Sequence, residues 1–157
     1  MGQWIEPGQR APEFTLTADD GSKVRLSELK GRPVVLYFYP QDDTPGCTRQ
    51  ACALRDRQAE LQRLGAVVLG VSPDSVESHG NFRDKFRLNF PLLADQEHQV
   101  AEKYGAWREK NMYGKKSMGI QRSTFLIDSE GKVNKVWKRV KVDGHDEQVL
   151  AALAELT

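Results

Sequence analysis

The chain has 157 residues, of which 39% are hydrophobic and 29% are charged, so we predict one soluble domain that spans residues 1–157 and buries its own core. Its 23 basic and 22 acidic side chains nearly cancel, which argues against nucleic acid as a partner. There is no basic leader followed by an apolar stretch, and no run of roughly 18 apolar residues, so we expect no membrane association and a cytoplasmic location.

The first part of the chain predicts a hairpin and then a buried strand. Residues 14–17 and 23–26 flank an Asp-Gly step that favours a turn between two short strands. Residues 34–39 are continuously apolar and β-branched or aromatic, which is typical of a central strand buried on both faces. Pro40 ends this strand because proline cannot donate a hydrogen bond to a neighbouring strand.

The middle of the chain alternates between helix and strand. The pattern predicts a helix over 47–64 that Gly65 closes, a buried strand over 66–71, a helix over 75–87, a short extended segment over 91–93 and a helix over 96–104. This alternation indicates an α/β fold.

The last part predicts a second hairpin and a closing helix. Residues 123–127 and 133–137 flank a polar turn, and 145–156 is amphipathic. Two late antiparallel strands would make the central sheet mixed. The basic residues between 132 and 141 alternate with valines, and we interpret them as a solvated strand edge protected by lysines.

The three histidines, His79, His98 and His145, lie in polar helical segments. We interpret them as exposed side chains and not as ligands. A zinc site would need further cysteines or histidines at suitable spacing, so we expect no metal and no cofactor.

The two cysteines, Cys47 and Cys52, lie in one short segment that leads from the central strand into a helix. This position places Cys47 in the first helical turn, where unpaired backbone N–H groups and the helix dipole favour the thiolate, the form that attacks. A free cysteine is often only a small buried hydrophobe. The Thr-Pro-Gly run before Cys47 and the second cysteine after it favour the reactive interpretation.

The spacing of the two cysteines has a conformational consequence. Five residues of α-helix separate two Cα atoms by roughly 8 to 9 Å, whereas a disulfide needs less than about 7 Å. If one helix includes both cysteines, the bond can form only after that turn unwinds. The alternative for Cys52 is a core residue beside Ala51 and Leu54.

With the motif Pro40-x-x-x-Thr44-x-x-Cys47, the chain resembles the peroxiredoxins, and specifically the peroxiredoxin Q group, also called bacterioferritin comigratory proteins. Further matching blocks lie at 11–16, 35–52, 70–74, 90–95 and 119–128, so the resemblance covers nearly the whole chain. It implies a thioredoxin-like α/β fold with a central mixed sheet flanked by helices and an N-terminal hairpin.

The resemblance also implies a role for five residues. Cys47 would be the peroxidatic cysteine and Cys52 the resolving one, while Thr44 would donate a hydrogen bond toward the thiolate and the peroxide. Pro40 would shield the pocket, and Arg122 would lower the pKa of the thiol and hold the charge that develops on the departing oxygen.

The implied function is a thiol-dependent peroxidase that reduces hydrogen peroxide and organic hydroperoxides to water and alcohols. The cycle would pass through a Cys47 sulfenic acid and a Cys47–Cys52 intramolecular disulfide, which thioredoxin or a similar dithiol protein would reduce. The expected state is a monomer, with a weak dimer as the alternative. One residue departs from the family pattern, because Gln50 stands where a glutamate is usual.

Two other functions use the same pair of cysteines. A dithiol/disulfide exchange enzyme would reduce protein disulfides and ignore peroxide, although the usual C-x-x-C spacing is absent. A redox-responsive binding protein would change its partners on oxidation without turnover.

Overall fold

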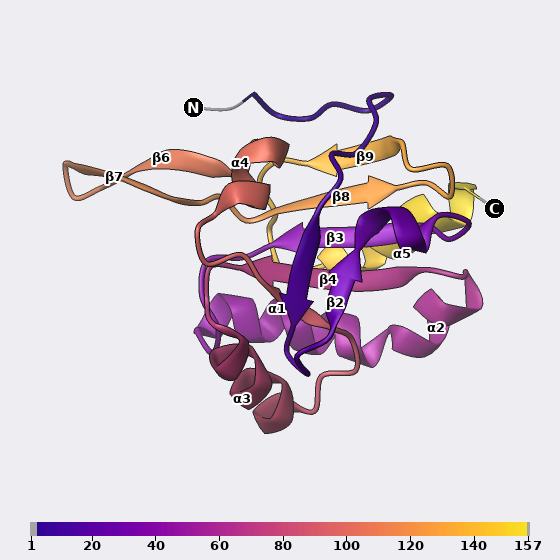
Figure 1. Cartoon of the computed structure of the whole chain (residues 1–157), viewed down its shortest axis with the longest axis horizontal. Coiled ribbons are helices and arrows are strands. Elements are labelled where there is room, and N and C mark those ends of the chain that lie inside the picture. Colours follow the sequence, from indigo (N-terminus) through magenta and orange to yellow (C-terminus); the bar gives the residue numbers. More distant parts are fainter. Residues whose placement is uncertain (1–2, 157) are drawn as a thin grey trace.

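A seven-stranded mixed sheet organises residues 3–156, the part of the chain that the computed structural model describes (Figure 1). The strand order is β2-β1-β5-β4-β3-β8-β9, in which β3, β4 and β5 run parallel and the other neighbours are antiparallel. The strands are β1 Thr15–Ala18, β2 Lys23–Arg25, β3 Val34–Phe38, β4 Val67–Ser72, β5 Leu92–Ala94, β8 Ser123–Ile127 and β9 Val133–Trp137. The predicted α/β architecture with a mixed sheet and an N-terminal hairpin is confirmed.

Helices cover both faces of this sheet. Alternate residues of a strand point to opposite faces, and every residue of β3 is buried, as predicted for a central strand. One face packs against α1, α2, α3 and α5, and the other against α4, the 3₁₀ turn η1 and the N-terminal segment. The bounds are η1 Leu26–Leu29, α1 Pro45–Asp56, α2 Gln58–Arg63, α3 Val76–Phe86, α4 Gln99–Tyr104 and α5 His145–Leu156.

The helix predicted over 47–64 is two helices, because helical structure is interrupted at Arg57. Arg57 has φ −101° and ψ 7°, and its N–H bonds to the carbonyl oxygen of Leu54 in a tighter turn. Its guanidinium lies 2.9 Å from Asp146 and 3.4 Å from Glu147, both in α5. The break therefore occurs where the chain makes ion pairs with a distant helix.

A two-stranded hairpin that the sequence did not predict projects from the body of the molecule (Figure 1). It consists of β6 Trp107–Met112 and β7 Lys115–Ile120. Tyr113 and Gly114 join the strands with φ angles of 54° and 78°. Positive φ at both positions is the mirror-image turn that suits the twist of a hairpin.

Two of the three histidines contradict the prediction of exposed side chains. His79 is 0% and His145 is 2% exposed, because each ring has polar partners inside the protein. In His145, Nε2 lies 2.8 Å from the Thr124 hydroxyl and Nδ1 lies 3.0 Å from the Gln148 amide oxygen. His98 is half-buried and stacks on Trp107.

The basic stretch near the C-terminus lies where the sequence predicted it. Strand β9 is at the edge of the sheet, and the side chain of Lys135 on it is exposed. Just beyond the strand, Lys138 pairs with Glu6 at 3.0 Å. Across residues 3–156, no helix has the length and apolar character needed to cross a membrane.

The stability of the protein should depend on the protonation of His145. Burial is the main reason that the pKa of His145 lies below its ordinary 6.5. The unfolded chain therefore takes up a proton that the folded protein excludes. The free energy of unfolding is therefore highest above the pKa that His145 has in the unfolded chain. It falls as the pH decreases through the lower pKa of the folded protein.

We expect the free energy of unfolding to fall between about pH 7 and pH 5 in the wild-type protein, and to fall less in His145→Gln. Urea denaturation at several pH values measures the difference between the two proteins. Equal pH dependence in both would show that His145 does not contribute.

Candidate active site

Cys47 lies in the first turn of α1, as the sequence predicts. Strand β3 ends at Phe38, a loop follows, and α1 begins at Pro45 with Thr44 as its N-cap. The side chain of Cys47 is 2% exposed and packs in the core layer between α1 and the sheet. In this position the unpaired N–H groups and the positive end of the helix dipole favour a thiolate.

Arg122 contacts this thiol from the start of the neighbouring strand, β8. It directly precedes β8, whose first residue, Ser123, pairs with Phe38 at the end of β3. Its Nη2 donates to Cys47 Sγ at 3.2 Å, and its Nη1 donates to Gln50 Oε1 at 2.7 Å. One guanidinium thus holds two residues of the same helix.

A glycine makes room for this guanidinium. A Cβ atom at Gly46 would lie 3.1 Å from Arg122 Nη2, closer than an ordinary contact. Any larger residue at this position would push the guanidinium away from Cys47. In the Pro-Gly-Cys run, the glycine therefore lets Arg122 approach Cys47, and the proline begins the helix.

One of the two polar atoms of the Gln50 side chain, the amide oxygen, forms a hydrogen bond. Gln50 is 2% exposed, and its amide oxygen accepts from Arg122. Its Nε2 has no hydrogen-bond partner among the residues that the structure describes. A carboxylate at this position would present two acceptors and a negative charge, so the amide holds Arg122 more weakly.

Thr44 and Pro40 lie in the loop before α1. The Thr44 hydroxyl donates to the carbonyl oxygen of Gln41 at 2.9 Å, so its proton is not directed at Cys47 as the resemblance implied. Its oxygen is still able to accept a hydrogen bond. Pro40 is half-buried between the strand and this loop.

Cys52 is half-buried in the same helix as Cys47, and both thiols are free. Helical geometry keeps their Cα atoms roughly 8 to 9 Å apart, beyond the reach of a disulfide. The structure therefore represents the dithiol form with α1 wound.

A buried polar network that the sequence did not predict fixes the loop before α1. The Asp42 carboxylate accepts from Tyr39 Oη at 2.6 Å and from Ser78 Oγ at 2.7 Å, and it lies 2.7 Å from His79 Nδ1. The backbone N–H of Asp42 donates to Asp74 at 2.7 Å. These bonds join the loop to α3 and to the turn that follows β4.

The ring of His79 is held on both sides. His79 Nε2 lies 3.0 Å from the carbonyl oxygen of Leu93, which can only accept, and Nδ1 faces a carboxylate. Both ring nitrogens of His79 therefore have a polar partner inside the protein. Ligand atoms of Asp42, Asp74 and His79 lie within 4.8 Å of one another, but they are already engaged in these hydrogen bonds.

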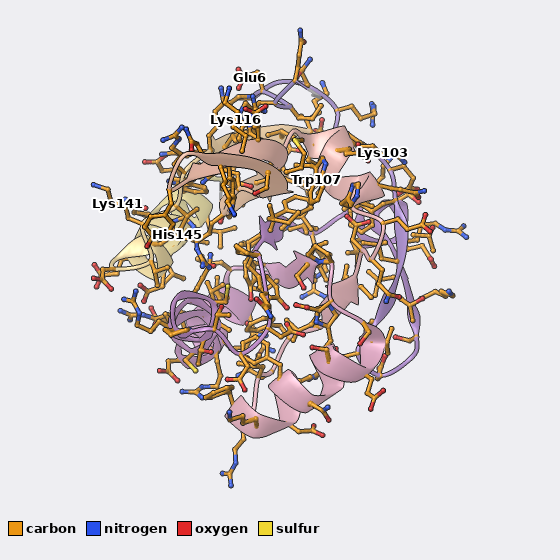
Figure 2. All side chains as sticks on the ribbon, turned by 90° about the vertical axis from the view of Figure 1, so that its left-hand side faces the viewer. Glu6, Lys103, Trp107, Lys116, Lys141 and His145 are labelled. Atoms are coloured by element: carbon orange, nitrogen blue, oxygen red, sulfur yellow. The ribbon has the colours of Figure 1, made fainter. Side chains whose placement is uncertain are left out.

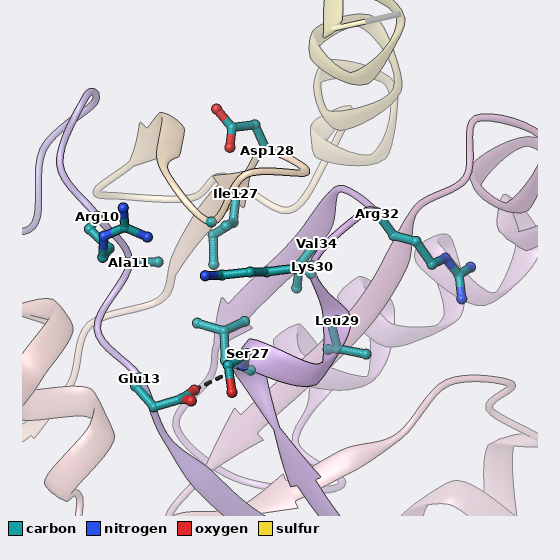
Figure 3. A pocket seen from close by; sticks show the side chains of 12 residues that line it. Arg10, Ala11, Glu13, Ser27, Leu29, Lys30, Arg32, Val34, Ile127 and Asp128 are labelled. Atoms are coloured by element: carbon teal, nitrogen blue, oxygen red, sulfur yellow. Dashed lines mark hydrogen bonds between the residues drawn. The ribbon is translucent and has the colours of Figure 1, made fainter.

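A separate pocket lies at the opposite end of β3 (Figure 3). Its volume is about 170 Å³, and its walls include Val34 at the start of β3 and Ile127 at the end of β8. Arg10 and Lys30 lie at its rim, and Glu13 there accepts from the backbone N–H of Ser27 at 3.0 Å. Neither cysteine lines it, so it is not the site of the thiol chemistry.

Known proteins resemble this chain along nearly its full length. The profile of the AhpC/TSA family matches residues 7–136. The putative peroxiredoxin bcp of Coxiella burnetii is 53% identical, over 95% of this chain and 99% of that protein. The peroxiredoxin Bcp of Bacillus subtilis is 50% identical, over 98% of each chain.

The fold agrees with solved structures of the same group. A peroxiredoxin Q of Xanthomonas campestris superposes with a TM-score of 0.92 at 40% identity, over 98% of this chain and 100% of that one. A structure of the bacterioferritin comigratory protein of the same organism, from work on its alkyl peroxide reduction activity, has a TM-score of 0.89 at 40% identity and covers all of both chains. The thioredoxin-like fold is thereby confirmed, and the chain belongs to the AhpC/TSA family, within its peroxiredoxin Q or bacterioferritin comigratory protein group of thiol peroxidases.

Proposed function

We propose that residues 1–157 act as a single peroxiredoxin domain that reduces hydrogen peroxide and organic hydroperoxides in the cytoplasm. Cys47 is the nucleophile and Cys52 the resolving thiol. The observation that carries this assignment is the guanidinium of Arg122, which lies 3.2 Å from Cys47 Sγ at the start of α1. A donor in this position favours the thiolate and is within reach of a peroxide bound against it.

The first half of the cycle is attack on the peroxide. The Cys47 thiolate takes the terminal oxygen of ROOH, the O–O bond breaks, and a sulfenic acid and an alcohol or water result. Arg122 stabilises the charge on the departing oxygen. The Thr44 hydroxyl oxygen accepts a hydrogen bond from the peroxide while the hydroxyl still donates to the carbonyl oxygen of Gln41. Pro40 shields the thiolate from water.

The second half is resolution. The N-terminal turns of α1 unwind, Cys52 attacks the sulfenic sulfur, and water leaves as the disulfide forms. Unwinding breaks the bonds from Arg122 to Cys47 and Gln50. Thioredoxin or a similar dithiol protein then reduces the disulfide by exchange. Because both cysteines lie in one chain, a monomer suffices.

The test is the intact mass of the protein under non-reducing conditions after one equivalent of hydrogen peroxide. We expect the wild type to lose two hydrogens, and Cys47→Ser and Cys52→Ser to form no such disulfide. Cys52→Ser should react once and stop as a sulfenic acid. An unchanged wild-type mass would overturn the proposal, and a disulfide-exchange enzyme would give that result.

The ease with which α1 unwinds should determine resistance to overoxidation. A second peroxide that reaches the sulfenic acid before Cys52 does converts it to sulfinic acid. Arg49 lies on the exposed face of α1 between the cysteines and pairs with Asp143. Arg49→Ala and Arg49→Gly lose the same ion pair, but glycine weakens the helix by about 1 kcal/mol relative to alanine.

We therefore expect Arg49→Gly to form several-fold less sulfinic acid than Arg49→Ala at the same peroxide dose. Mass spectrometry of the Cys47 peptide measures the yield. Equal yields in the two variants would show that unwinding does not compete with the second oxidation.

A further inference from the structure

The pocket at the start of β3 has no part in the cycle above. Figure 1 shows that β3 runs toward the end of the molecule from which the β6–β7 hairpin projects, and Figure 2 views that end, with Trp107 and Lys116 labelled on the hairpin. Cys47 follows the C-terminal end of β3, whereas Val34, the first residue of β3, lines the pocket. The pocket therefore lies at the opposite end of the strand from the thiol chemistry.

The inside of this pocket is mostly apolar. Val34 and Ile127, which line it, are 2% and 1% exposed, and further apolar side chains in its wall are those of Ala11, Leu26 and Leu29. The volume of about 170 Å³ is close to the roughly 150 Å³ of an apolar cavity that binds benzene. The pocket thus has room for one ring or about six carbon atoms.

Backbone hydrogen bonds hold the walls of the pocket together. The N–H of Ala11 donates to the carbonyl oxygen of Gly131 at 2.9 Å, and the N–H of Gly31 donates to that of Ser129 at 2.8 Å. These bonds tie the N-terminal segment and the loop before β3 to the turn between β8 and β9. The pocket is therefore formed before any ligand enters, which lowers the entropic cost of binding.

Two cationic side chains converge at the mouth of the pocket. Figure 3 shows Arg10 and Lys30 extending toward each other from opposite sides, whereas Arg32 points away. A Cβ atom at Gly131 would lie 3.6 Å from Lys30 Cε and 3.8 Å from Arg10 Nη1, so both side chains pass the same point of the β8–β9 turn. The two positive charges are thus close enough to act on one ligand.

Neither of these cations has an ion-pair partner in the part of the chain that the structure describes. No carboxylate of residues 3–156 lies within 4.0 Å of Arg10 or Lys30, although the exposed Lys138 pairs with Glu6 at 3.0 Å. Two like charges that converge without a counter-charge favour an anion between them.

The two carboxylates of the pocket wall are engaged elsewhere. Glu13 accepts from the backbone N–H groups of Phe14 and Ser27 at 3.1 and 3.0 Å. Asp128 accepts from two backbone N–H groups of its own turn, both at 3.0 Å. These bonds direct both carboxylates toward the backbone, so the positive charge at the mouth is left for an anion from solution.

We propose that this pocket binds a small amphipathic carboxylate, one that carries a single ring or a chain of about six carbons. The apolar part of the ligand lies against Val34 and Ile127, and its carboxylate lies between Arg10 and Lys30. A guanidinium donates two parallel hydrogen bonds to a carboxylate, and the ammonium adds a third. This second site is independent of the reaction of Cys47 with peroxide.

The test is a titration of isotope-labelled, reduced protein with three probes, followed by the amide chemical shifts in NMR spectra. Benzoate has a ring and a charge, benzamide has the ring without the charge, and acetate has the charge without the ring. We expect saturable binding of benzoate with a Kd of about 1 mM. The amides of Ala11, Gly31 and Gly131 should shift and that of Cys47 should not, while benzamide and acetate should bind about tenfold more weakly.

Three variants test the two cations. Arg10→Met and Lys30→Met should each weaken the binding of benzoate by about tenfold, because each loses a charge-assisted hydrogen bond. Lys135→Met removes an exposed charge of β9 that does not line the pocket, and it should bind benzoate as the wild type does. The same spectra show whether each variant is folded.

Binding of benzamide or acetate as tight as that of benzoate would overturn the proposal, and so would equal affinities in Arg10→Met and Lys135→Met. Shifts that do not saturate, or that centre on Cys47, would also overturn it. Oxidation of Cys47 by peroxide is measured separately, so a failure there would contradict the proposed function alone.

Discussion

Replacing Arg122 by methionine is expected to slow the reaction of Cys47 with peroxide by about 10² to 10³-fold, the usual effect of removing one charge-stabilising donor from an active site. Methionine fills much of the same space but cannot donate to Cys47 Sγ or Gln50 Oε1. Iodoacetamide alkylation should also slow, because Arg122 acts on the thiolate itself. Stopped-flow oxidation and alkylation rates measure the two effects.

Two further variants sharpen this prediction. Arg122→Lys keeps the charge but loses the fork that bonds Cys47 and Gln50 together, so we expect an intermediate rate. Arg49→Met removes an arginine from the exposed face of the same helix, where its guanidinium pairs with Asp143 at 2.8 Å. This variant should leave the rate of Cys47 oxidation unchanged. A normal rate in Arg122→Met would remove Arg122 from the mechanism.

Replacing Asp42 by alanine is expected to destabilise the protein by about 3 to 5 kcal/mol, because it leaves the polar groups of Tyr39, Ser78 and His79 without their shared partner. The carboxylate accepts three hydrogen bonds within 2.7 Å, and the His79 ring is fully buried. The free energy of unfolding in urea measures the loss.

The neighbouring aspartate provides the control. Asp43 is exposed and pairs with Lys85 on the surface, so Asp43→Asn should cost less than about 1 kcal/mol. Asparagine also tolerates the positive φ of 57° at this position. If Asp42→Ala and Asp43→Asn proved equally stable, the buried network would not fix the loop.

The sheet and the position of Cys47 could be predicted because the relevant signals are local. Continuous apolar residues mark β3, and the Thr-Pro-Gly run before Cys47 marks a helix start. Arg122 was found only through the family resemblance, since its partner lies 75 positions away. No local pattern distinguishes it from the other arginines of the chain.

The features that the sequence missed depend on distant partners or lack periodicity. His79 is buried because Asp42, 37 residues before it, supplies a carboxylate. The β6–β7 hairpin is polar along most of its length and turns at Tyr113 and Gly114, without the alternation or the Asn-Gly signal that predicts a hairpin.

The break at Arg57 limits how far the redox transition can spread. We expect α1 and α2 to open separately, because Leu61 in α2 is fully buried and anchors that helix on its own. The backbone amides of α1 should therefore exchange their hydrogens as one cooperative group, and those of α2 as another. Formation of the disulfide would then abolish protection from hydrogen exchange in α1 and leave that of α2 intact. A reductant protein would therefore bind a remodelled segment on an otherwise unchanged surface.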